Sequence, residues 1–202
     1  MGRMILIEGL DLAGKSTAVR GLRERLSGPV RYARNSLCPD NPIAAVADEL
    51  RSDPEHTALE GSCLYVAAHE WDLRHFSPPD EGVHLQDSCW LRALAYDRAL
   101  GCLEMTARWR QSCERWPRFD TVIFLTASLE ERRRRYATRA HNDSGDAWVF
   151  SCPGRFVALE RALREEALAQ GATEVDTTGL SESQVLTRCE ELISARTVQR
   201  AA

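Results

Sequence analysis

Short apolar runs alternate along this chain with longer segments in which apolar residues recur at helical spacing. In the first such segment, Ala18, Val19, Leu22 and Leu26 share one face of a helix expected from about Lys15 to Leu26. The apolar runs themselves predict five strands, at Met4–Glu8, Val30–Ala33, Val83–Gln86, Thr121–Thr126 and Thr173–Val175.

The helical segments carry recognisable end signals. Thr57 and Glu60 predict a capping box for a helix reaching about His75, and Pro42 is expected at the first position of another helix. Further helices are expected at 89–113, at 129–139 and at about 155–170, and Ser181 with Gln184 is expected to cap the last helix. Residues 140–154 are expected to form a polar loop. Because strands alternate with helices, the pattern predicts an α/β fold with a buried parallel sheet, in a single domain spanning 1–202.

The composition and charge limit the kinds of molecule that this chain is expected to bind. The 202 residues carry a net charge of −4, which gives no general attraction for the phosphates of nucleic acids or membranes. No apolar run approaches the ~20 residues that span a bilayer, and the N-terminus lacks signal-peptide anatomy. We therefore expect a cytoplasmic protein that binds neither nucleic acid nor membrane. The seven cysteines are expected to be reduced thiols, because their number is odd and none are spaced as Cys-x-x-Cys.

The strongest chemical signal is the segment from Gly9 to Thr17, which matches the Walker A pattern G-x-x-x-x-G-K-[ST]. Its lysine is the only one in a chain with 26 lysines and arginines. An apolar strand precedes this P-loop and an amphipathic helix follows it, which argues against an accidental match. The pattern predicts ATP with Mg²⁺, and the residues expected to cradle the phosphates are Gly9, Leu12, Ala13, Gly14, Lys15, Ser16 and Thr17. Lys15 would reach the β- and γ-phosphates, and the Ser16 hydroxyl would bind the metal ion.

The run from Ile5 to Thr17 resembles the opening of thymidylate kinases and, more loosely, of deoxynucleoside kinases. The resemblance covers most of the chain and also rests on Val83–Ser88, Ala95-Tyr96, Leu125–Arg135 and Val175-Asp176. It implies a P-loop kinase fold with a five-stranded parallel sheet flanked by helices. It further implies a short arginine-rich lid at about 132–154 and a possible homodimer.

Two carboxylates are candidates for the reaction centre. Asp87 ends an apolar strand, where it would meet Mg²⁺ or the water bound to it. Asp11 lies inside the P-loop, and the resemblance gives it a role as metal partner or proton acceptor. Either could be an ordinary turn or capping residue, and which of the two takes the proton stays open.

Arginines crowd one predicted helix, at residues 132–135 and 139. They could form a solvated face that complements the helix C-terminus, or a lid that brings positive charge to the transferring phosphoryl group. Some thymidylate kinases carry an arginine within the P-loop, but Leu12 and Ala13 stand there in this chain. The lid must then supply the cation, and we favour Arg135 and Arg139, one helical turn apart.

The acceptor side departs from the family. Val66 stands where an aromatic ring stacks on thymine, Glu70 where an arginine contacts the acceptor, and Ser88 where an arginine grips its phosphate. Arg34 keeps an acceptor-side arginine, and Arg92, one turn beyond Ser88, could replace the missing cation. A Glu70 that faces the pocket would favour hydroxyls or a positive group there. These changes predict an acceptor other than ordinary dTMP.

Three function classes remain open. The first is a kinase of a small molecule, either a nucleotide- or nucleoside-like compound or a non-nucleotide metabolite with a hydroxyl group. The second is a regulatory P-loop ATPase without an acceptor, and the third is a degenerate binding protein. GTP selectivity through an Asn/Thr-Lys-x-Asp motif is excluded, because Lys15 is the only lysine.

Overall fold

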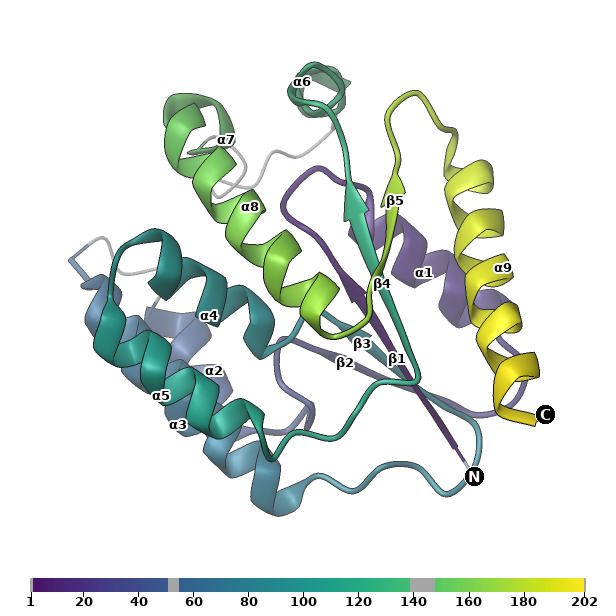
Figure 1. Ribbon diagram of the computed structural model, residues 1–202, viewed down its shortest axis with the longest axis horizontal. Coiled ribbons are helices and arrows are strands. Elements are labelled where there is room, and N and C mark those ends of the chain that lie inside the picture. The colour runs from purple at the N-terminus through teal and green to yellow at the C-terminus, as the bar shows by residue number, and fades with distance from the viewer. Residues whose placement is uncertain (1, 51–54, 139–147, 202) are drawn as a thin grey trace.

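In the computed structural model, five parallel strands form a central sheet (Figure 1). The structure describes residues 2–50, 55–138 and 148–201. The sheet has the order β2-β3-β1-β4-β5, and each neighbouring pair is parallel. Its strands are β1 Arg3–Glu8, β2 Val30–Arg34, β3 Val83–Asp87, β4 Thr121–Thr126 and β5 Thr173–Asp176. The predicted α/β fold with a five-stranded parallel sheet is confirmed.

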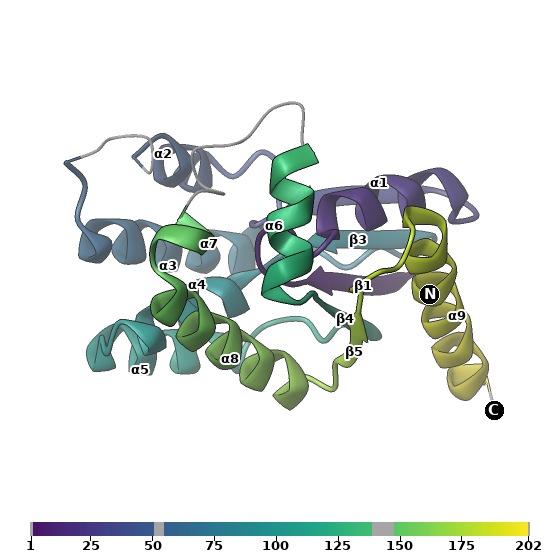
Figure 2. The same ribbon diagram turned by 90° about the horizontal axis from the view of Figure 1, so that it is seen from above.

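The helices lie on both faces of the sheet because the central strands are apolar on both sides. Ile5 and Ile7 of β1 belong to a core shared with α1 and α9, and Met4 and Leu6 belong to a core shared with α3, α4, α5 and α8. Figures 1 and 2 show these groups on opposite sides of the sheet. The helices are α1 Lys15–Arg25, α2 Pro42–Leu50, α3 Ala58–His75, α4 Trp90–Ala99, α5 Leu103–Cys113, α6 Leu129–Thr138, α7 Trp148–Ser151, α8 Pro153–Ala169 and α9 Glu182–Ala201.

One predicted helix is wrong. Residues 89–113 form two helices, α4 and α5, because Gly101 adopts a left-handed conformation with φ 73° just after α4 ends. Its N–H donates to the carbonyl of Arg98 and closes that helix. The expectation of a polar loop at 140–154 is also partly wrong, since α7 lies within it and α8 begins at Pro153. Residues 139–147 lie outside the described part of the chain.

The predicted helix caps are present. Thr57 and Glu60 form the reciprocal capping box at the start of α3. Ser181 and Gln184 exchange the same pair of hydrogen bonds before α9. In the part of the chain that the structure describes, no helix is long and apolar enough to cross a membrane.

The carboxyl ends of all five strands lie at one edge of the sheet, because the strands are parallel. Glu8, Arg34, Asp87 and Asp176 each end a strand there. The loops that follow therefore converge, and in parallel α/β sheets this edge is where ligands bind. The P-loop is one of these loops.

Candidate active site

The P-loop forms a tight turn between β1 and α1. Gly9 has φ 148°, and a Cβ on it would lie 2.4 Å from the carbonyl oxygen of Leu125, so only glycine fits. Gly14 has φ 91° and is the N-cap of α1, with no side-chain hydrogen bond covering the helix start. The first backbone N–H groups of a helix lack partners within it, so the start of α1 is suited to an anion.

Side chains outside the P-loop hold its carbonyl groups. Arg92 donates to Gly9 O at 3.1 Å, Arg135 to Leu12 O at 2.9 Å, and the Thr177 hydroxyl to Ala13 O at 3.0 Å. Arg132 donates to the carbonyl of Asp11. With these four carbonyls engaged from outside, the loop is held in one conformation. None of these four contacts follows from the Walker A pattern.

Lys15 and Asp87 form a nearly buried ion pair across the site. Lys15 Nζ lies 2.7 Å from Asp87 Oδ1, and the two side chains are 8% and 4% exposed. The Tyr32 hydroxyl donates to Asp87 Oδ2 at 3.4 Å, and Arg34 Nε lies 3.9 Å from the same oxygen. Burial and the negative charge of Asp87 raise the pKa of Tyr32, which therefore stays a donor. Asp87 is thus surrounded by donors from β2 and α1.

Asp11 is held from two sides. Arg92 Nη2 lies 3.2 Å from its carboxylate, and Arg132 binds its carbonyl oxygen. Burial disfavours the charge of Arg92, but the carboxylates of Asp11 and Glu8 raise the pKa of Arg92 overall, so it stays positive. The structure therefore brings two of the predicted residues, Asp11 and Arg92, into direct contact.

Glu8 is a polar residue of this site that the sequence analysis missed. It is fully buried and accepts hydrogen bonds from Gly9 N at 2.9 Å, Ser88 Oγ at 2.9 Å and Cys89 N at 3.2 Å. Burial raises the pKa of Glu8, whereas the positive charges of Arg92 and Lys15 lower it. Glu8 therefore links the P-loop to the turn that follows Asp87. Its signal was a charged residue at the end of an otherwise apolar strand.

Ser88 differs from its predicted role. The sequence placed it on the acceptor side, but the residue is fully buried and has φ 62°. Its hydroxyl donates a hydrogen bond to the Glu8 carboxylate. A side chain enclosed in this way has no surface for an acceptor. The prediction is corrected: Ser88 shapes the turn after β3.

Arg132 differs from both interpretations of the arginine run, a solvated face and a lid over the transferring phosphoryl group. It is fully buried, its Nε donates to Ala127 O at 3.0 Å, and it forms an ion pair with Glu160 of α8. Its guanidinium carbon lies 4.9 Å from the centre of the Phe156 ring. Arg132 therefore belongs to the support beneath the P-loop.

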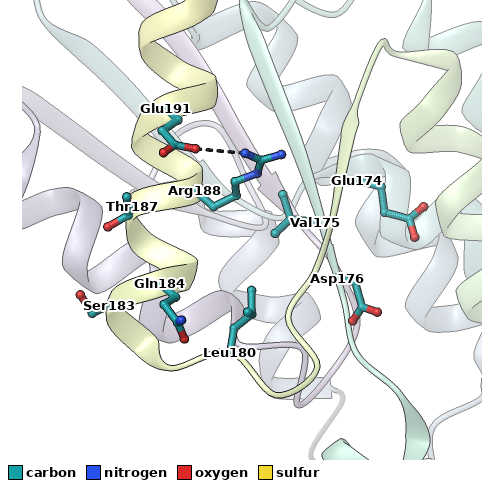
Figure 3. Close-up of a pocket in the computed structure, with 9 residues that line it drawn as sticks. All are labelled: Glu174, Val175, Asp176, Leu180, Ser183, Gln184, Thr187, Arg188 and Glu191. Carbon is teal, nitrogen blue, oxygen red and sulfur yellow. Dashed lines mark hydrogen bonds and ion pairs between the residues drawn. The ribbon is translucent and has the colours of Figure 1, made fainter.

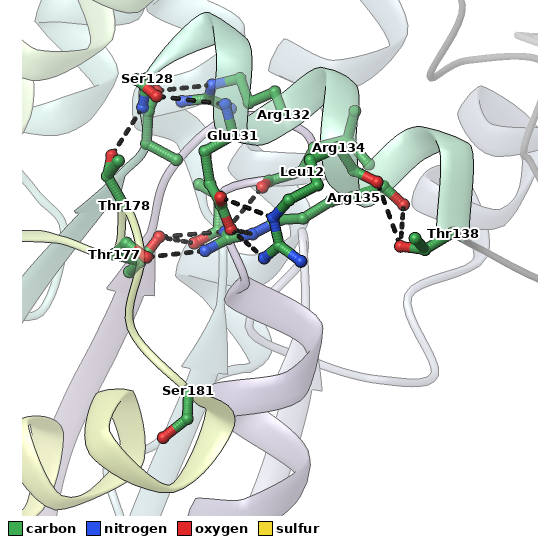
Figure 4. Close-up of polar contacts among 12 residues, drawn as sticks. Leu12, Ser128, Glu131, Arg132, Arg134, Arg135, Thr138, Thr177, Thr178 and Ser181 are labelled. Atoms are coloured by element: carbon green, nitrogen blue, oxygen red, sulfur yellow. Dashed lines mark hydrogen bonds and ion pairs between the residues drawn. The ribbon is translucent and has the colours of Figure 1, made fainter.

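Arg135 lies between α6, the P-loop and the segment after β5 (Figure 4). Besides its bond to Leu12 O, Arg135 donates from Nη2 to Thr177 O at 2.7 Å, and its Nε lies 2.8 Å from Glu131 Oε1. Hydrogen bonds from Arg134 and Arg135 lower the pKa of Glu131 to about 2, so its negative charge persists. Arg135 Nη1 would lie 3.5 Å from a Cβ on Gly14, which places a cation beside the start of α1. Arg139 lies outside the described residues.

The remaining acceptor-side candidates do not gather in one place. Arg34 is 62% exposed beside Asp87, whereas Val66 is buried in the core. Glu70 turns to the end of α5, where it pairs with Arg115 and accepts from Ser112 at 3.2 Å. The hydrogen bond from Arg115 lowers the pKa of Glu70, whose charge is therefore already matched.

A separate hollow of about 590 Å³ lies between β5 and α9 (Figure 3). Its lining includes Glu174, Asp176, Gln184 and Arg188, and Arg188 pairs with Glu191 at 3.1 Å. No P-loop residue lines this hollow. The candidate site is therefore defined by the P-loop and the carboxylates beside it.

Comparisons with known proteins show what this chain is similar to in sequence and in fold. A thymidylate kinase of Dictyostelium discoideum is 26% identical over 141 residues, which make up 66% of this chain and 62% of that relative. The chain thus spans less than two thirds of that relative's length. No family model matches.

Two solved structures have the same fold. A thymidylate kinase from Candida albicans matches with a TM-score of 0.72 and 21% identity, covering 97% of this chain and 92% of that one. A thymidylate kinase from Ehrlichia chaffeensis matches with a TM-score of 0.66 and 13% identity, covering 95% and 98%. The chain is therefore thymidylate kinase-like in sequence and has the thymidylate kinase P-loop fold.

Proposed function

We propose that this chain is a P-loop kinase that moves the γ-phosphate of MgATP to a small-molecule acceptor. The geometry of the P-loop carries the proposal. The P-loop has the conformation that its glycines permit, its carbonyls are held from outside, and its lysine lies 2.7 Å from Asp87. This arrangement binds and orients phosphates, and positioning with electrostatic stabilisation supplies most of the catalysis in phosphoryl transfer.

The donor side fits a nucleotide with its metal ion. Ser16 is exposed in the first turn of α1, and Asp87 lies against Lys15 of the same turn, so Ser16 and Asp87 would hold Mg²⁺. The ion neutralises charge on the phosphate oxygens when it is bound. Lys15 would exchange part of its contact with Asp87 for the β- and γ-phosphates. The N–H groups at the start of α1 would bind the same anion.

The chemical step needs an oriented acceptor oxygen. That oxygen forms a bond to the γ-phosphorus while the bond to the bridging β–γ oxygen breaks, and ADP leaves. For a hydroxyl acceptor, the proton passes to Asp11 or Asp87. Arg92 and Arg132 fix Asp11 in place, which supports a direct role for its carboxylate.

Arg135 is the cation we assign to the transferring phosphoryl group among the described residues. Its side chain lies beside Gly14, in the P-loop whose middle residues Leu12 and Ala13 supply no positive charge. Arg139 stays a prediction for the same task. Guanidinium groups placed on developing phosphoryl charge accelerate such reactions.

The acceptor is proposed to be a nucleotide- or nucleoside-like compound other than ordinary dTMP. Val66 offers no ring for stacking on a base, and Glu70 is a carboxylate paired with Arg115. Arg34 and Arg92 lie beside Asp87 and Asp11 and would attract an anionic group on the acceptor. A cytoplasmic location and a homodimer stay predictions. Sedimentation analysis of the chain in solution would measure its oligomeric state.

The test is ADP release from ATP in the presence of single compounds: dTMP, other nucleoside monophosphates, nucleosides and hydroxylated metabolites. The proposal expects acceleration by a nucleotide- or nucleoside-like compound well above that by dTMP. Fast turnover of dTMP alone would refute the altered acceptor. Slow hydrolysis that no compound accelerates would instead favour a regulatory ATPase.

A further inference from the structure

A buried carboxylate on α3 organises the loop that follows β2. Asp72 is fully buried, and it accepts from Ser36 Oγ at 2.7 Å, Leu37 N at 2.7 Å, Cys38 N at 3.2 Å and Asn41 Nδ2 at 2.9 Å. Every one of these donors belongs to the loop at residues 35–41. The carboxylate thus gathers its hydrogen bonds from a single loop.

The donors around Asp72 are neutral. His69 Nδ1 lies 4.0 Å away, but burial lowers the pKa of His69 to about 3, so the ring carries no charge at neutral pH. Burial and the charge of Asp72 raise the pKa of Cys38 to about 11, so this residue stays a thiol. The negative charge of Asp72 is therefore balanced by the dipoles of N–H and O–H groups, which requires one conformation of the loop.

The same loop is joined to the reaction centre. Asn35 N donates to the carbonyl of Asp87 at 3.0 Å, and Gln86 Nε2 donates to Ser36 O at 3.2 Å. Asn35 has φ 60°, so the chain turns sharply right after Arg34. A shift of the loop would therefore move Arg34 relative to Asp87, from which it is 3.9 Å away.

We propose that Asp72 is a positioning residue for the acceptor side, which acts by holding loop 35–41 and thereby Arg34. This inference rests on the proposed kinase function. An apolar core residue would fill the same space without fixing the loop, whereas a buried carboxylate with donors from a single loop specifies its conformation.

The test compares Asp72→Asn with Asp97→Asn. Asp97 is a similarly buried control, 2% exposed, whose carboxylate instead binds Ser62 Oγ at 2.6 Å and Trp109 Nε1 at 2.7 Å. The amide introduced by Asp72→Asn would bring a donor to a place where four donors already point. We expect Asp72→Asn to raise the KM of the best panel acceptor about tenfold or more and to leave the KM of ATP within about twofold. The control should change neither KM by more than about twofold.

Hydrogen exchange of the ligand-free chain tests the loop without activity. The amides of Leu37 and Cys38 should exchange at least about tenfold faster in Asp72→Asn and not in Asp97→Asn. Ser36→Ala, which removes one donor, should shift the acceptor KM and both amides in the same direction by less. Ser36→Ala therefore still tests the inference if Asp72→Asn does not fold.

The outcomes are distinct. If the wild-type chain phosphorylates no panel compound, the kinase proposal fails, and the exchange rates still decide whether Asp72 holds the loop. Unchanged amides at Leu37 and Cys38 would overturn the inference. It would also be overturned if the amides loosen but the acceptor KM stays constant, or if Asp97→Asn raises that KM equally.

Discussion

Arg132→Ala should destabilise the protein more than any other single arginine change in α6 among the described residues. The side chain is fully buried, and it donates to the carbonyls of Ala127 and Asp11 and pairs with Glu160. Its removal leaves the half-buried carboxylate of Glu160 without its cation. Breaking a buried ion pair by removing one partner costs about 3–5 kcal/mol.

The lower end of that range applies, because the Glu160 side chain is 19% exposed and water can partly solvate it. We therefore expect a loss of about 3 kcal/mol in the free energy of unfolding. For a chain of this size, each kcal/mol lowers the melting temperature by about 2–4 °C, so the fall should be roughly 6–12 °C.

Urea unfolding followed by circular dichroism measures this loss. Arg134→Ala is the matched control, because its side chain is 63% exposed and pairs with Glu131. Glu131 keeps its ion pair with Arg135 when the exposed Arg134 is removed, so the control should lose only about 0–1 kcal/mol. Glu160→Gln added to Arg132→Ala should recover part of the loss, since no unpaired charge remains. The reasoning is refuted if Arg132→Ala costs less than about 1 kcal/mol or no more than the control.

Three further changes test other parts of the account. Gly9→Ala should abolish ATP binding in a filter or calorimetric assay, because its Cβ would lie 2.4 Å from Leu125 O; retained affinity would contradict the geometry. In His69→Phe, the loss of stability in acid should be smaller than in the wild type. Burial lowers the pKa of His69 to about 3 in the folded chain, against 6.5 when unfolded, so its contribution to stability is complete above pH 6.5 and declines toward pH 3, by roughly 3 kcal/mol at pH 4.5. Parallel pH–stability curves for wild type and variant would rule this out. Cys38, with its pKa raised to about 11 by burial and Asp72, should react with iodoacetamide at pH 8 far more slowly than exposed Cys63, as peptide mass spectrometry can show; equal labelling would count against the enclosed thiol.

The sequence predicted what depends on local pattern. The strands, the P-loop and the caps at Thr57 and Ser181 each follow from neighbouring residues, and the structure contains them. The break at Gly101 was also a local signal, but the apolar periodicity on both sides of it favoured a single helix. Helices often tolerate a glycine, so periodicity alone does not decide whether a helix ends there or continues through it.

The supports of the site could not be predicted in this way. Arg132 and Asp11 are 121 positions apart in the chain, and Ser88 and Glu8 are 80 apart. Whether such a polar side chain faces solvent or a buried partner depends on how the helices pack, which periodicity does not encode. This is why the run of arginines suggested a solvated face or a lid, whereas Arg132 is buried.

The central claim is that the P-loop lysine drives phosphoryl transfer, and Lys15→Ala tests it most directly. Arg20→Ala, an exposed residue of the same helix, is the control. ADP release with the best acceptor should fall by about 100-fold or more in Lys15→Ala and stay near wild type in Arg20→Ala, while circular dichroism shows both variants folded. Unchanged phosphoryl transfer by folded Lys15→Ala would contradict the account.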